Sequence, residues 1–138
     1  MPADTSALDA AVIAVLGDAT LATYCTNGVH WDEAPHGSTA FVIVSQQDHE
    51  DGYVQSTEGT ETVQYLIKAV IKGTAGATVK SAAARIHTLL QDIAMTATGY
   101  RVLSVTRQER IRYTEVDESN DDRWQHRGGR YQVMAEPT

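Results

Sequence analysis

Residues 60–93 read TETVQYLIKAVIKGTAGATVKSAAARIHTLLQDI, and this stretch decides the fold. From Glu61 to Lys72, β-branched and aromatic residues recur with a period of two, which predicts a strand. After a turn of small residues at 73–76, apolar residues recur at spacings of three and four from Ala77 to Ile93, which predicts an amphipathic helix. The strand face that we expect to be buried carries Val63, Tyr65, Ile67, Ala69 and Ile71. The strand and the helix are therefore expected to pack against each other.

The second face of this strand carries Leu66 and Val70 and also needs cover. We expect the cover to come from the first helix of the chain, predicted from Asp4 to Leu16, or from a neighbouring subunit. The first helix has its own apolar stripe, with residues at spacings of three and four. Its packing partner decides whether the sheet is covered on one face or on both.

The rest of the chain adds one short helical turn and several strands. The predicted segments are a helical turn from Asp18 to Tyr24, short extended residues 29–31, a strand from Thr39 to Ser45, a strand from Tyr100 to Val116 and a strand from Arg123 to Ala135. The Gly128-Gly129 pair within the last strand predicts a bulge or a close backbone approach. The fold class is therefore α+β, with a mainly antiparallel sheet of four or five strands, two main helices and the order α-(α)-β-β-β-α-β-β.

Size and composition indicate one globular domain covering residues 1–138. The hydrophobic fraction of 42% and the charged fraction of 21% are ordinary for soluble proteins. No apolar run approaches the roughly 20 residues that a membrane span needs, so no membrane partner is expected. The only cysteine, Cys25, excludes an internal disulfide framework, and we expect it to be a buried apolar side chain instead of a nucleophile.

The formal charge of −7 is spread unevenly along the chain. Residues 1–98 carry four bases and eleven acids, whereas residues 99–138 carry seven arginines and seven acids. An acidic chain is a poor candidate for gripping nucleic acid, because that affinity comes largely from neutralised phosphates. Two predicted loops, Gln46 to Gly59 and Glu115 to Asp122, concentrate the acids as candidate lumen-facing or partner-facing surfaces. Their acidic residues are Asp48, Glu50, Asp51, Glu58, Asp117, Glu118, Asp121 and Asp122.

The two C-terminal strands combine arginines with aromatic residues. This composition is typical of protein–protein contacts, since arginine stacks on aromatic rings and forms bidentate pairs. The candidate interface contains Arg107, Arg110, Arg112, Tyr113, Trp124, Arg127 and Arg130. Two alternatives are cross-strand pairing with Glu109 and Glu115 on a solvated face, and a platform for single-stranded nucleic acid.

Motifs for catalysis are weak. The chain has no GxGxxG, GxxxxGK[ST] or GxSxG motif. The best grouping for a metal is His36 with Asp48, His49 and Asp51, but its spacing matches neither a helical zinc site nor a CxxC site. A solvated acidic loop explains the same residues. A small metal-dependent enzyme that uses His36, His49 and Asp51 is therefore a secondary hypothesis.

Four segments of the chain resemble the tail terminator (tail completion, or neck) proteins of bacteriophages with long, non-contractile tails. LDAAVIAVLGDATLATYC (residues 8–25) is similar to the first helix and short turn of that family. VHWDEAPHGSTAFVIVS (residues 29–45) is similar to its short strand, proline-containing loop and apolar strand. TVQYLIKAVIKGTAGATVKSAAARIHTLLQ (residues 62–91) and RWQHRGGRYQVMAE (residues 123–136) resemble its strand–turn–helix unit and its closing strand.

The resemblance implies a structural virion protein without enzyme activity or cofactor. Such proteins form a ring, commonly a hexamer, which caps the tail tube, ends its growth and provides the head–tail joining surface. The implied partners are further copies of the chain, the tail tube protein and the head-side connector or stopper protein, with the tape measure protein as an additional candidate. DNA would only pass through the lumen, and the ring would be assembled in the host cytoplasm. A head-side neck or stopper protein of the same virion is the alternative.

Overall fold

The computed structural model describes residues 6–54, 57–74, 76–91 and 95–138, which form helices and strands in an α+β arrangement. The elements in chain order are α1 (Ser6–Leu16), α2 (Ala19–Tyr24), β1 (Val29–Trp31), β2 (Ala40–Val54), β3 (Thr57–Lys72), α3 (Gly76–Leu90), β4 (Thr96–Ala97), β5 (Tyr100–Asp117) and β6 (Asp122–Pro137). The predicted fold class is confirmed. None of the described helices has the length and apolarity needed to cross a membrane.

The strands form one sheet in the order β1-β2-β3-β6-β5-β4. Six strands replace the four or five that were predicted, because the two-residue strand β4 pairs with the start of β5. The sheet is also not purely antiparallel, since β1 runs parallel to β2 from Val29↔Val42 to Trp31↔Val44. Strands as short as β1 and β4 carry too few residues for a periodic sequence signal.

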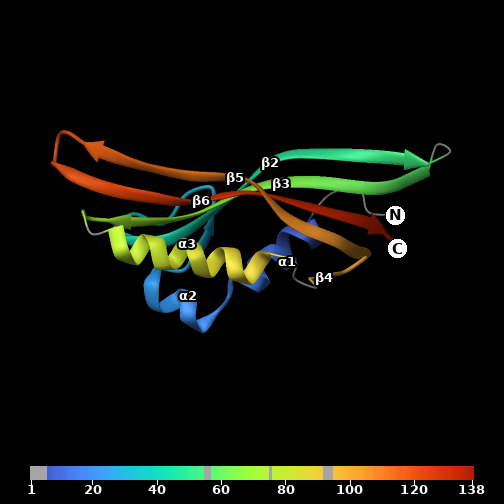
Figure 1. The fold of residues 1–138 in the computed structure, drawn as a ribbon, viewed down its shortest axis with the longest axis horizontal. Helices are drawn as coiled ribbons and strands as arrows, with labels where there is room; N and C mark the ends of the chain where they lie inside the picture. Colours follow the sequence, from blue (N-terminus) through green and yellow to red (C-terminus); the bar gives the residue numbers. More distant parts are fainter. Residues whose placement is uncertain (1–5, 55–56, 75, 92–94) are drawn as a thin grey trace.

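Two long hairpins, β2–β3 and β5–β6, meet through the pairing of β3 with β6. This pairing runs without interruption from Glu61↔Ala135 to Lys72↔Trp124. The tips of the two hairpins point to opposite ends of the molecule (Figure 1). The prediction of a loop from Gln46 to Gly59 was wrong, because β2 continues to Val54 and β3 begins at Thr57. We call residues 46–54 and 57–61 the β2–β3 arm.

All three helices lie on one face of the sheet (Figure 1). Tyr65, Ile67 and Ala69 of β3 are fully buried there with apolar residues of α1 and α3, as the alternation predicted. The expectation that α1 covers Leu66 and Val70 was wrong. Helix α1 packs on the same face as α3, where Tyr65 donates a hydrogen bond to Asp9 of α1 at 2.5 Å. We call the other face, which no described helix covers, the open face.

The predicted close approach at Gly128-Gly129 is confirmed. A Cβ atom on Gly128 would lie 2.1 Å from the carbonyl oxygen of Ile67 and 2.5 Å from the Cα of Lys68. One on Gly129 would lie 2.7 Å from the carbonyl oxygen of Glu109. The irregularities of register lie on the neighbouring strand β5, between Val102 and Ser104 and between Arg107 and Glu109, so β6 itself is not bulged.

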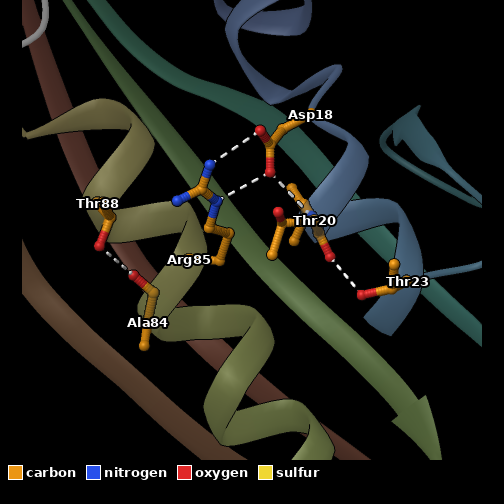
Figure 2. A network of polar contacts seen from close by, with 7 residues as sticks. Asp18, Thr20, Thr23, Ala84, Arg85 and Thr88 are labelled. Carbon is orange, nitrogen blue, oxygen red and sulfur yellow. Dashed lines mark hydrogen bonds and ion pairs between the residues drawn. The ribbon is translucent and has the colours of Figure 1, made fainter.

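A charged clamp joins α2 to α3 (Figure 2). Asp18 is the N-cap of α2, and its Oδ2 accepts a hydrogen bond from the Leu21 amide at 2.9 Å. The same carboxylate accepts two hydrogen bonds from the Arg85 guanidinium, at 2.8 and 2.9 Å. These Arg85 bonds, with the Leu21 amide, lower the pKa of Asp18 from 3.8 to about 2. The predicted helical turn after Asp18 is thereby both confirmed and fixed against α3.

Candidate interaction surfaces

The seven residues predicted as one interface are divided between the two faces of the sheet. Four arginines, Arg107, Arg110, Arg112 and Arg127, line a groove together with residues of α3. Tyr113 and Trp124 lie on the open face instead, where Tyr113 stacks on His126 and Trp124 contacts Phe41. Arg130 contacts Gln47 and Glu109. The hairpin therefore presents two chemically different surfaces, which a list of strand residues cannot separate.

We call the first surface the arginine groove, and it has a volume of about 500 Å³. Its lining residues are Lys80, Ala83, Ala84, His87, Thr88, Arg107, Arg110, Ile111, Arg112, Arg127 and Gly128. Lys80 of α3 adds a fifth permanent cation, which sequence reasoning missed because Lys80 is distant in the chain. Within the described part of the chain, none of these five cations forms an ion pair with a carboxylate.

One lining residue of the arginine groove, His87, is held by a hydrogen bond to the sheet. His87 Nδ1 of α3 and the Tyr131 hydroxyl of β6 form a hydrogen bond at 3.2 Å, which joins the helix to the sheet. Burial raises the pKa of Tyr131, and the nearby charge and hydrogen bond of Arg107 oppose the shift. The groove therefore lies between two elements, α3 and β6, that are hydrogen-bonded to each other.

The open face carries an aromatic cluster around His126. The His126 ring stacks on Tyr113 with ring centroids 4.3 Å apart, and Lys68 donates a hydrogen bond to the Tyr113 hydroxyl at 2.6 Å. His126 Nε2 lies 3.1 Å from a carboxylate oxygen of Glu115. Burial lowers the pKa of His126 and the Lys68 charge adds to this, while the bond to Glu115 opposes it. Desolvation thus favours the neutral imidazole.

A depression of about 480 Å³ on the open face is lined by both polar and apolar residues and includes Lys68, Glu115 and His126 of this cluster. Trp124 and Phe41 contact each other there at 6.2 Å between ring centroids, and the Lys72 ammonium lies 5.8 Å from the Trp124 ring. The lining residues are Asp32, Glu33, Ala34, Phe41, Ile43, Ser45, Leu66, Lys68, Val70, Glu115, Trp124 and His126. This is the face of Leu66 and Val70 for which the sequence predicted a cover.

Cross-strand pairing of arginine with glutamate, one of the alternatives for the hairpin, occurs at one predicted position only. Arg130 pairs with Glu109, whereas Glu115 pairs with His126. Arg112 lies directly opposite Arg127 across the β5–β6 pair. Like charges directly opposite each other destabilise a sheet. The arginines of the groove are therefore not explained as ion pairs of the hairpin.

The first group of predicted acidic residues lies on strands and not in a loop. Asp48 and Glu50 of β2 are exposed, and they pair with Gln64 and Thr62 of β3. Asp51 and Glu58 occupy strand positions of the same arm, and their side chains lie outside the described part of the structure. The sequence of the whole arm contains five acids and neither lysine nor arginine.

The second acidic group flanks a tight turn, since β5 ends at Asp117 and β6 begins at Asp122. The predicted loop therefore begins too early, at Glu115, which belongs to β5. Asp117 accepts hydrogen bonds from the backbone and hydroxyl of Ser119, which lower its pKa. Asp122 pairs with Lys72 and Asp121 with Arg123, while Glu118 is exposed. This turn is less free to bind a partner than the β2–β3 arm.

The geometry gives no support for the predicted metal grouping. His49 lies 3.6 Å from Glu61, a buried carboxylate of β3. Among the residues whose placement is described, no three histidine, cysteine, aspartate or glutamate side chains lie close enough to bind a metal ion. Cys25 is buried, as predicted, and burial raises the pKa of its thiol to about 11, which disfavours the nucleophilic thiolate.

Comparison with solved structures adds a full-length match. A chain of the structure described as "Virion of native gene transfer agent (GTA) particle" superposes with a TM-score of 0.68 and 25% sequence identity. The match covers 97% of this chain and 99% of that chain. This chain shares the fold of a virion protein. A second structure, with a TM-score of 0.59, 13% identity and 96% coverage of both chains, supports the fold alone. No family model and no curated protein matches the sequence.

Proposed function

We propose that this chain is a structural virion protein that forms a ring, capping the tail tube of a phage-like particle and joining it to the head. The observation that carries the proposal is the likeness to a chain of a gene transfer agent virion over nearly the whole of both chains. The sequence resemblance to tail terminator proteins points to the same class. The resemblance implies a ring on the tail side, and the head-side neck is the competing position.

The architecture supports a role in assembly. Two hairpins extend in opposite directions from a shared core, and each offers a strand edge that is largely unpaired by the described strands. Open edges tend to pair with other chains. The arginine groove and the acidic β2–β3 arm give one subunit two different patches, which a head-to-tail ring requires. The proposed partners are other copies of the chain, the tail tube protein and the head-side connector protein.

Electron microscopy of the purified protein mixed with tail tubes tests the proposal. We expect rings at the ends of the tubes and shorter tubes when the protein is present during polymerisation. Light scattering that shows only monomer, with and without tubes, would contradict a ring. Cross-linking to the head-side ring and not to the tube would instead assign the chain to the head-side neck.

A further inference from the structure

The arginine groove is electrostatically incomplete in a single copy of the chain. Arg112 faces Arg127 across the strand pair, and Arg107 and Arg110 line the same depression. Lys80 of α3 adds to the same field. Placing these like charges together opposes folding of the lone subunit. An anionic group bound in the groove would relieve this repulsion, so we expect the groove to bind an acidic partner.

The β2–β3 arm carries the complementary charge. Its sequence holds five acids and neither lysine nor arginine. Glu61 is buried, whereas the side chains of Asp48 and Glu50 are exposed and available to a partner. The groove is lined by α3, and the arm extends away from α3 towards the end of the molecule opposite the β5–β6 tip (Figure 1), so the arm does not reach the groove of its own chain. The acidic element and the basic groove can therefore meet only between two copies.

We propose that the β2–β3 arm of one copy binds in the arginine groove of the next copy. The contact joins two different patches, so it repeats head to tail and generates a ring or a filament. This inference rests on the proposed function, for which it supplies the contact between neighbouring subunits. Beyond Val44 no described strand pairs with the outer edge of β2, and β4 pairs with β5 only at Tyr100 and Arg101. Backbone groups on both edges are thus accessible for the same contact.

Nucleic acid is the competing anionic ligand. The chain has a net charge of −7, and repulsion from the rest of the surface opposes the approach of a polyphosphate to the groove. The acidic arm is present at the same concentration as the groove itself, because both belong to the same chain. The observations therefore favour a second copy of the chain over DNA.

Charge reversal tests each half of the contact. One variant carries Arg110→Glu and Arg112→Glu in the groove, and the other carries Asp48→Lys and Glu50→Lys on the arm. We expect each to weaken self-association at least about tenfold, measured by mass photometry and by ring occupancy at tube ends. Self-association of the unmodified protein should also weaken as salt is raised.

Combining the four substitutions in one chain is the decisive step. The combined variant keeps the net charge of −7, since the two pairs of reversals cancel, and it restores attraction between arm and groove. We expect it to recover most of the lost self-association. Arg101→Glu with Arg123→Glu is the matched control, because it changes the charge by the same amount at exposed positions outside the groove. Thermal melts within a few degrees of the unmodified protein would show that all variants fold.

The outcomes separate this inference from the proposed function. Rings that persist in both reversal variants would overturn the contact and leave the proposed ring untouched. A combined variant that self-associates no more strongly than either reversal variant would do the same. Recovery in the combined variant without rings on tubes would support the contact and contradict the capping role. A groove variant that loses affinity for a duplex DNA probe while the arm variant assembles normally would overturn the contact in favour of nucleic acid. A protein that is monomeric under every condition would contradict both.

Discussion

At the scale of single residues, the Asp18 carboxylate makes stability depend on acidity. The Arg85 and Leu21 hydrogen bonds hold its folded pKa at about 2, below the ordinary value of 3.8. A lowered carboxyl pKa contributes stability above the ordinary value, and this contribution is lost as pH falls from about 4 to about 2.

Asp18→Asn keeps an acceptor for the α2 cap but removes the charge that Arg85 binds. We expect the variant to melt below the unmodified protein at pH 7 and to melt at the same temperature near pH 2. Circular dichroism melts across this range measure the difference. Asp121→Asn is the control, because Asp121 is 87% exposed and lies 3.6 Å from Arg123. A gap between the Asp18 variant and the unmodified protein that persists at pH 2 would contradict the assignment.

Gly128 sets the distance between β3 and β6. Gly128→Ala would bring a methyl group to 2.1 Å from the Ile67 carbonyl oxygen, so the strands must separate. We expect a loss of about 1–3 kcal/mol in the free energy of unfolding, measured by urea titration. Gly76→Ala is the matched control, since a Cβ there meets nothing within 4 Å. Equal effects of the two substitutions would refute the steric role of Gly128.

At the scale of elements, one tyrosine joins α1 to the sheet. Tyr65→Phe removes the hydrogen bond to Asp9 without changing the buried ring. We expect a cost of about 2 kcal/mol and faster hydrogen exchange in α1, because a bond to a charged acceptor is lost. The same change at Tyr113, which is 45% exposed, should cost less than about 0.5 kcal/mol. If α1 exchange were unaltered, the tyrosine would not be its anchor.

Periodicity predicted β3 and α3 correctly because each buries one face more completely than the other. It failed for the β2–β3 arm, where residues 46–50 are all exposed and no contrast between faces remains. The arm is held by backbone pairing of β2 with β3 over its whole length. Such pairing depends on a partner strand and leaves little trace in the hydrophobic pattern. The acids of the arm were identified from the sequence, but their strand positions were not.

At the scale of the whole molecule, the groove could not be predicted because it needs α3 beside the hairpin. The sequence identified Arg107, Arg110, Arg112 and Arg127, but it grouped them with Tyr113, Trp124 and Arg130. A register shift in β5 between Arg107 and Glu109 and the placement of α3 decide which side chains share a face. Both are tertiary features, so strand alternation alone assigns the wrong neighbours.

The net charge of the molecule gives a further prediction. We expect the assembled protein not to bind a duplex DNA probe at about 150 mM salt, because acidic residues outnumber basic ones and, in the proposed contact, the arms would occupy the grooves. Fluorescence anisotropy with a labelled duplex measures this, and a basic DNA-binding protein serves as the positive control. A dissociation constant near 10 µM or tighter would contradict this prediction.

The continuous pairing of β3 with β6 has a mechanical consequence. Twelve successive residue pairs, from Glu61↔Ala135 to Lys72↔Trp124, join the two hairpins into one continuous, stiff part of the sheet. The acidic arm lies towards one end of this part, and the β5–β6 tip lies at the other (Figure 1). A rotation of the β2–β3 hairpin must therefore also rotate the β5–β6 hairpin. Binding of the arm by a neighbouring subunit would therefore also fix the orientation of the β5–β6 hairpin. Each added subunit would then present its own groove in a defined orientation to the next subunit.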